Sequence, residues 1–220
     1  MFAVIGWSII VAQPKLTLPQ YKQYTLRDGL SQMQVTSMFQ DSRGYIWVGT
    51  KAGLNCYNGD KFVSYTTKKF PEILNDYIHL ICEDNQGRIW ASTNMGIFRV
   101  NGEDIKFFKI ESSPALYMTA DSHGKIWFVK NKYPDPKISI HFIEADSVSQ
   151  LQLYLPESKG FPRLEMKYIE EEDAFLVAND TLLYLIKNNK CEFIHRNNTY
   201  VHFFPGFKTP YFVDGYQRDI

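Results

Sequence analysis

A ten-residue pattern occurs three times in this chain and governs how it can fold. The copies read DSRGYIWVGT from Asp41, DNQGRIWAST from Asp84 and DSHGKIWFVK from Asp121. Their tryptophans, Trp47, Trp90 and Trp127, are about 40 residues apart, a period that is typical of stacked repeat architectures. One copy would indicate an ordinary hairpin, whereas three copies in register indicate a repeat.

Each copy is predicted to be a β-hairpin. Met38-Phe39 and Ile46-Trp47-Val48 are short apolar runs that favour strands, and the residues between them form the turn. Asp41 suits the first turn position, where its carboxylate can accept bonds from backbone amides, and Gly44 supplies the left-handed residue. The second strand is apolar on both faces, so we expect it to be covered on both sides. Central strands of α/β sheets are also covered on both sides, but no crossover-helix pattern separates these repeats.

The repeats predict an all-β chain, a β-propeller with blades of four antiparallel strands. We expect four blades, near residues 33–66, 77–109, 115–155 and 164–195, and the start of a fifth at 200–220. A chain that stops within a repeat leaves an unpaired edge, which closed propellers avoid. We therefore expect an N-terminal piece of a longer protein, forming an open arc of an incomplete ring. The repeat positions are Asp41, Gly44, Trp47, Gly53, Asp84, Gly87, Trp90, Gly96, Asp121, Gly124 and Trp127.

Three segments depart from the regular repeat. In the fourth blade Glu170 takes the place of the turn Asp, Asp173 that of the Gly, and Leu176 that of the Trp; Asp tolerates the left-handed conformation better than most residues. In the third blade we expect an inserted loop at Asn131–Lys137. Before the first blade, Gln20–Thr25 is predicted to be an orphan outer strand of the kind that closes a ring.

Composition limits the function classes. The chain has 220 residues and no net charge, which argues against binding to nucleic acids or anionic membranes. Three scattered cysteines show no metal-ligand spacing and cannot form a closed disulfide framework. The apolar Met1–Gln13 is too short to span a bilayer. It has the length of a signal-peptide core but no basic start, so we favour a clipped or weak signal peptide over the alternative, a buried strand.

The pattern from Val35 to Tyr57 resembles the two-component regulator propeller repeat. The residues that carry the resemblance are Val35, Ser37, Asp41, Gly44, Ile46, Trp47, Val48, Gly49, Thr50, Gly53, Leu54, Asn55 and Tyr57, with the lead-in Asp28-Gly29-Leu30-Ser31. The second repeat matches closely, the third in its first half, and the fourth only in pattern.

The resemblance implies the periplasmic sensor region of a hybrid two-component histidine kinase. In that family, propellers of about seven blades precede an immunoglobulin-like domain, a membrane helix anchored in the inner membrane, and the kinase. It implies an oligosaccharide ligand, further blades and downstream domains as partners, a homodimer of the parent as an option, and no cofactor. Since the kinase domain is absent from this chain, we expect no enzyme activity.

Several motifs have a functional and a structural interpretation. The three tryptophans could stack on sugars, but one fixed strand position in every repeat favours core between blades. Asp121-Ser122-His123 has the residue types of a hydrolase triad, but three consecutive turn residues cannot adopt its geometry. The acidic run Glu170–Asp173 could bind calcium or serve glycosidic cleavage, but a turn favours a solvated face. We therefore assign no catalytic and no metal-binding residue.

Tyr133 and Phe207 are the weak candidates for ligand binding, because both lie in segments that the repeat does not explain. A long ordinary loop is the alternative for each. The leading function is a ligand-sensing module. The alternatives are an interaction scaffold or secreted propeller of unrelated role and, less favoured, a polysaccharide lyase or glycosidase, which would need converging carboxylates or a metal near the axis.

Overall fold

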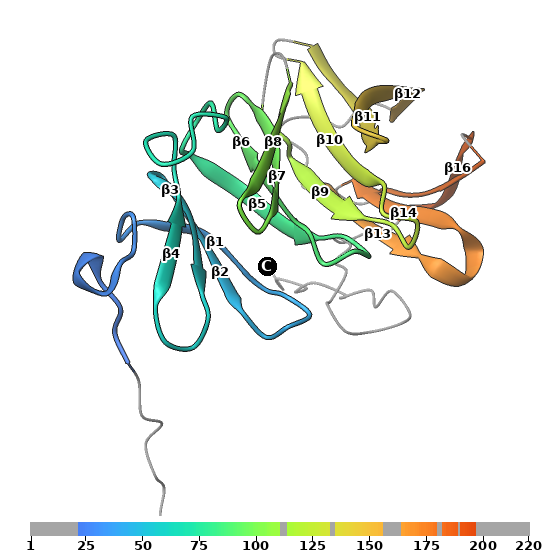
Figure 1. Ribbon diagram of the computed structural model, residues 1–220. Helices are drawn as coiled ribbons and strands as arrows, with labels where there is room; N and C mark the ends of the chain where they lie inside the picture. Colours follow the sequence, from blue (N-terminus) through green and yellow to red (C-terminus); the bar gives the residue numbers. More distant parts are fainter. Residues whose placement is uncertain are drawn as a thin grey trace, which may run out of the picture.

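The computed structural model describes residues 22–110, 114–132, 135–155, 164–179, 182–188 and 190–196. Their strands form four separate antiparallel sheets of four strands each, arranged side by side along an arc (Figure 1). The all-β propeller architecture predicted from the repeat is thereby confirmed. The expected leader Met1–Gln13 and the start of a fifth blade at 200–220 lie outside the described residues.

Each sheet is a meander in which consecutive strands pair. The first two sheets contain β1 (Val35–Gln40), β2 (Ile46–Thr50), β3 (Gly53–Tyr57), β4 (Phe62–Tyr65), β5 (Ile78–Glu83), β6 (Ile89–Thr93), β7 (Gly96–Asn101) and β8 (Asp104–Lys109). The other two contain β9 (Tyr117–Ala120), β10 (Ile126–Lys132), β11 (Asp135–Glu144), β12 (Ser147–Leu155), β13 (Leu164–Ile169), β14 (Ala174–Asn179), β15 (Leu182–Lys187) and β16 (Lys190–Arg196). The first strands β1, β5, β9 and β13 are neighbours around the inside of the arc.

Apolar side chains fill the spaces between adjacent sheets. Trp47, Leu54 and Cys56 of the first sheet pack against Ile89 and Phe98 of the second. Equivalent clusters join the second sheet to the third and the third to the fourth. A strand with apolar residues on both faces needs a neighbour on each side, which a stacked sheet supplies. The core therefore consists of a series of junctions rather than one centre.

The turn between the first two strands repeats its backbone conformation. Gly44, Gly87 and Gly124 have φ values of 86°, 74° and 82°. In the fourth sheet a short 3-10 turn, η2 (Glu170–Glu172), leads into Asp173, whose φ is 46°. The prediction that Asp173 takes the left-handed place of glycine is confirmed.

The prediction of an inserted loop at Asn131–Lys137 is wrong. β10 runs through Lys132 and β11 begins at Asp135, and Asn131 pairs with Ile138. The extra residues lengthen a hairpin, because continuing the ladder pairs backbone groups that a loop would leave to solvent.

The prediction of an outer strand at Gln20–Thr25 is also wrong for its described part. Residues 22–25 contain no strand, and a 3-10 turn, η1 (Leu26–Asp28), follows. Tyr24 instead packs on Tyr57 and Phe62 with ring centroids 5.0 and 5.4 Å away, and the Tyr24 hydroxyl donates to that of Tyr57 at 2.9 Å. Aromatic packing thus holds this segment on the first sheet without a backbone ladder.

Candidate functional site

A buried aspartate fastens each of the first three tryptophans to its own turn. The indole Nε1 groups of Trp47, Trp90 and Trp127 donate to Asp41, Asp84 and Asp121 at 3.0, 2.7 and 2.8 Å. The other carboxylate oxygen of each aspartate accepts two backbone N–H bonds across the turn; for Asp84 the donors are Gln86 at 2.9 Å and Arg88 at 3.1 Å. We call this arrangement the Asp–Trp pin.

The pin explains why the tryptophans are not exposed platforms. Trp47, Trp90 and Trp127 are 3%, 2% and 8% exposed, and each lies in the cluster that joins its sheet to the next one. A sugar ring that stacked on any of these faces would have to displace the neighbouring sheet. The pins therefore order the junctions.

Basic side chains cover the pins differently from junction to junction. At the second junction Arg88 and Arg99 flank the Trp90 ring, each 5.8 Å from its centre. Arg99 also binds Asp146 of the third sheet at 2.9 Å, which closes that junction. At the third junction Lys125 lies over the rings of Trp127 and Phe142 at 5.3 and 4.7 Å and pairs with Glu144 at 3.3 Å.

A crevice lies beside each pin, and the third is much the largest. The crevices at the first and second junctions enclose about 100 and 170 Å³, and that at the third about 590 Å³. Only the third has a volume in the range of small-molecule sites, roughly 300–1,000 Å³. It is lined by Asp121, His123, Lys125, Trp127 and Glu144 of the third sheet, and by Asp173, Phe175, Ile186 and Asn188 of the fourth.

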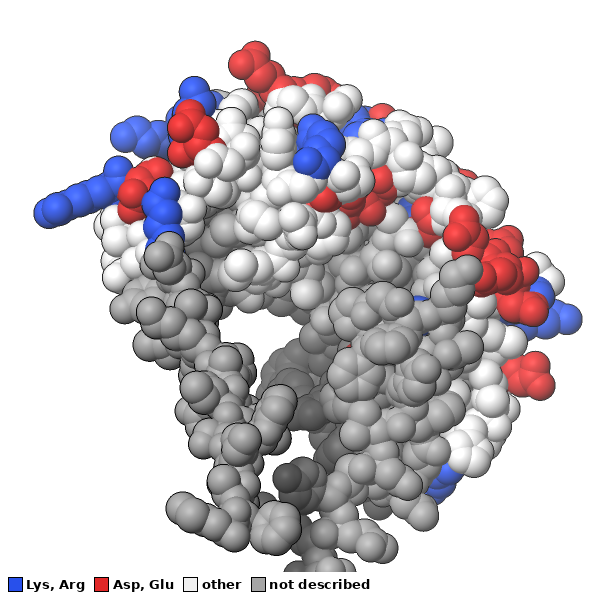
Figure 2. Space-filling view, turned by 90° about the horizontal axis from the view of Figure 1, so that it is seen from below, with Lys and Arg blue, Asp and Glu red and all other residues white. Residues whose placement is uncertain are grey.

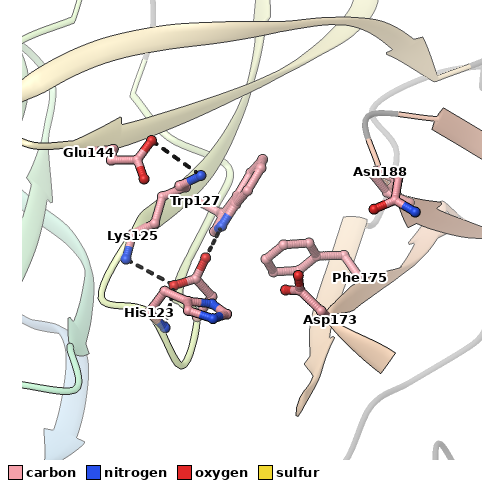
Figure 3. A pocket seen from close by; sticks show the side chains of 9 residues that line it. His123, Lys125, Trp127, Glu144, Asp173, Phe175 and Asn188 are labelled. Carbon is pink, nitrogen blue, oxygen red and sulfur yellow. Dashed lines mark hydrogen bonds and ion pairs between the residues drawn. The ribbon is translucent and has the colours of Figure 1, made fainter. Parts of the chain in front are cut away.

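The third crevice has an apolar floor and a polar rim. Trp127, Phe175 and Ile186 are buried, and the ring centroids of Trp127 and Phe175 are 4.8 Å apart. His123, Glu144, Asp173 and Asn188 are exposed. In Figure 3, Asp173 and Asn188 project from the fourth sheet and face Lys125 and Trp127 across the gap. Such a mixture of apolar surface and converging polar groups is typical of ligand sites.

Tyr168 ties the two walls together at one end. Its hydroxyl donates to Asp173 Oδ1 at 2.8 Å and lies 3.1 Å from Ser122 Oγ of the third sheet. Burial and the bond to Asp173 raise the pKa of Tyr168, against the opposing effect of the Ser122 contact. The phenol is therefore neutral at physiological pH and serves as a bridge between the two turns.

The other motifs of the sequence are structural in the described residues. Asp121 Oδ1 accepts from the backbone N–H groups of His123 and Lys125, both at 2.9 Å, as a turn residue does. Glu170, Glu171 and Glu172 are exposed, and Glu172 pairs with Lys187 at 2.7 Å. The weak candidates Tyr133 and Phe207 lie outside the described residues.

Within the described ranges, no three His, Cys, Asp or Glu side chains are close enough together to hold a metal ion. The same ranges contain no helix that is long and apolar enough to cross a membrane. Burial raises the pKa of the Cys56 thiol to about 11, which keeps it protonated and unreactive.

A buried histidine makes the second junction sensitive to acid. His141 Nε2 lies 2.8 Å from Ser139 Oγ, and its ring stacks on Phe128 at 5.2 Å. Burial, assisted by the charge of Lys130, lowers the pKa of His141 from 6.5 to about 4. Between pH 7 and pH 5 the unfolded chain therefore takes up a proton that the folded chain does not, and stability falls as the pH falls through 6.5.

We expect the free energy of unfolding to be about 2 kcal/mol lower at pH 5 than at pH 7 because of His141. Urea denaturation at both pH values measures it. His141→Gln should remove most of this difference, whereas His195→Gln, at an exposed position, should keep it. If the His141→Gln protein kept the full wild-type difference in free energy of unfolding between pH 7 and pH 5, groups other than His141 would cause that difference.

Comparison with known proteins identifies the repeats. Residues 29–52 and 72–95 match the family described as two-component regulator propeller. The chain is thus similar to that family over two segments, one in each of the first two blades. The matched residues of these regulator repeats end just after β2 and β6, so each match includes a lead-in, a first strand and an Asp–Trp pin.

One curated relative of these regulator repeats is histidine kinase P4 of Formosa agariphila. It is 39% identical over 67 residues, which cover 30% of this chain and 5% of the kinase. The chain thus spans a small part of that relative's length.

Two solved structures resemble this chain in fold. The extracellular domain of a putative one-component system from B. thetaiotaomicron has a TM-score of 0.55 and 18% identity, over 86% of this chain and 24% of that one. A catalytically inactive virginiamycin B lyase from Staphylococcus aureus has a TM-score of 0.56 and 19% identity, over 78% of this chain and 58% of the lyase. At these identities the likeness shows the fold alone.

Sequence reasoning missed the third crevice. Its residues come from two repeats, and their meeting depends on how two sheets stack. One signal was present in the sequence: the last turn of the first and second blades reads Asn-Gly, at Asn58-Gly59 and Asn101-Gly102, whereas the fourth has Asn188-Asn189.

Proposed function

We propose that this chain is the ligand-sensing propeller of a two-component regulatory system, that it detects oligosaccharides in the periplasm, and that it performs no catalysis. The observation that carries the proposal is the match of the first two blades to two-component regulator propeller repeats. The identity to a histidine kinase over 67 residues supports the same placement. In this proposal the propeller acts together with further blades and with kinase domains of a longer parent anchored in the inner membrane.

A lyase is the alternative that a specific observation brings forward, since a virginiamycin B lyase shares the fold. The two sequences are 19% identical and the match spans 58% of the lyase, so the similarity supports a shared fold and not a shared activity. The sensor assignment has the additional support of a sequence match in the blades themselves.

Isothermal titration with short oligosaccharides tests the proposal directly. The panel contains neutral oligomers of glucose, mannose, galactose and xylose, and an acidic oligomer of galacturonate. We expect at least one of them to bind at micromolar concentration and to be recovered chemically unchanged. Absence of binding across the panel would contradict oligosaccharide sensing, and new reducing ends or unsaturated products would favour the lyase or a glycosidase.

A further inference from the structure

The third crevice differs from the second in the side chains that surround its tryptophan. In the second sheet the residue paired with Trp90 is Arg99, which reaches across to Asp146. In the third sheet the residue paired with Trp127 is Phe142, which stays beneath Lys125. Lys125 itself turns back to Glu144 of its own sheet. The contact of Tyr168 with Ser122 crosses the third junction at one end of the crevice, so the space beside Lys125 and Trp127 stays open.

Two polar residues enter this space from turn positions with a left-handed backbone. Asp173 and Asn188 have φ values of 46° and 52°, in the left-handed region. The turns that correspond to that of Asp173 have Gly44, Gly87 and Gly124, and those that correspond to that of Asn188 have Gly59, Gly102 and, in the third sheet, Ala145-Asp146 with φ values of 45° and 64°. A left-handed conformation costs a non-glycine residue some free energy, and such positions are concentrated at functional sites. Here both side chains face the crevice (Figure 3).

The charges of the lining select among ligands. Asp121, Glu144 and Asp173 contribute three carboxylates, and Lys125 contributes an ammonium group that is already paired with Glu144. Figure 2 shows further acidic side chains gathered toward the right, the side on which the fourth sheet lies in Figure 1. An anionic ligand would meet these carboxylates, and the one ammonium group of the lining is already paired, so like-charge juxtaposition opposes binding.

We infer that the crevice between the third and fourth sheets is a saccharide subsite for neutral sugar rings and excludes uronate or sulfated ones, an inference that rests on the proposed function. Sugar hydroxyls donate to the carboxylates of Asp173 and Glu144 and bond the amide of Asn188. The apolar face of the ring lies toward the edges of Trp127 and Phe175. Because the walls belong to different sheets, an occupied subsite also bridges the junction.

The test is titration of the 220-residue chain with the neutral oligomers and with the galacturonate oligomer, followed by two variants. Asp173→Gly and Asn188→Gly remove the polar groups and install a residue that adopts the left-handed conformation without steric cost. Asp173→Gly also removes the bond from Tyr168, whereas Asn188→Gly leaves that bond in place. Each should weaken binding of the neutral oligomer about tenfold, as loss of hydrogen bonds to a ligand does. Glu171→Gln, in the same turn but outside the lining, is the matched control and should bind as the wild type does.

The outcomes separate this inference from the proposed function. Neutral binding that falls in both glycine variants and persists in Glu171→Gln supports both. Neutral binding unaffected by the variants overturns the subsite and leaves oligosaccharide sensing intact. Tight binding of galacturonate overturns the charge argument alone. No binding by any oligomer overturns both.

Discussion

Replacing Asp84 with alanine is expected to lower the free energy of unfolding by about 4 kcal/mol, since removal of one partner from a buried ionic and hydrogen-bonded group costs roughly 3–5 kcal/mol. The Asp84 side chain is fully buried. It accepts the indole N–H of Trp90 and the backbone N–H groups of Gln86 and Arg88, and pairs with the Arg88 guanidinium at 2.7 Å. Alanine would leave these donors unsatisfied within a junction that has a sheet on each side.

Urea denaturation with a fixed m value measures this loss. Asp84→Asn is the informative intermediate: its amide has one oxygen and one NH₂ group, so the NH₂ faces donors that the carboxylate had accepted, and we expect about half the loss. Asp60→Ala at an exposed turn should change stability by less than about 0.5 kcal/mol. If Asp84→Ala lost no more free energy of unfolding than Asp60→Ala, the pin would not contribute to stability.

The fold could be predicted because the residues that determine it recur at a regular spacing in the sequence. Trp47, Trp90 and Trp127 mark the same strand position at blade-sized spacing, and a strand that is apolar on both faces requires a neighbour on each side. The turn chemistry of Asp41 and Gly44 is local, so it too could be predicted. Asp173 in place of glycine followed from the known tolerance of aspartate for the left-handed conformation.

The pin and the crevice could not be predicted from the same information. The Asp–Trp bond joins residues six positions apart, on opposite sides of a turn, and its formation depends on how the hairpin twists. The crevice depends on how the third and fourth sheets stack. The residue paired with each pinned tryptophan, which is Cys56, Arg99 or Phe142, is known only once the strand register is known. The longer hairpin at Asn131–Lys137 could not be predicted either, because its extra residues have no counterpart in the other repeats.

The Asp–Trp pins, the third crevice and the proposed ligand binding all concern the interfaces between neighbouring sheets. A stacked array gains stability mainly from the interfaces between neighbours, so a junction with an empty space is the one that a ligand can stabilise most. Pins order the first three sheets, and Leu176 replaces the pinned tryptophan in the fourth. The third junction therefore combines the largest crevice with the end of the regular repeat, as a ligand-responsive junction requires.

Gly96→Ala is expected to destabilise the chain by about 3 kcal/mol, because it forces atoms into a space that backbone occupies. Gly96 opens β7 with a φ of 157°, and an added Cβ would collide with the carbonyl oxygen of Phe108 and the ring of Phe107 on β8. A backbone oxygen cannot turn aside as a side chain can, so the strand pair must separate locally. Phe108 stacks on Trp90 with ring centroids 5.4 Å apart, so the shift also reaches the pin.

Gly102→Ala is the matched control for this prediction. Gly102 has a φ of 64° in the next turn of the same sheet, but an added Cβ would meet no atom within 4 Å. It should therefore cost only the backbone term, about 1 kcal/mol. Urea denaturation of both variants separates steric overlap from conformational preference. Equal losses in the two would show that the β7–β8 edge can widen without penalty, and that the junction beneath Trp90 is looser than its burial indicates.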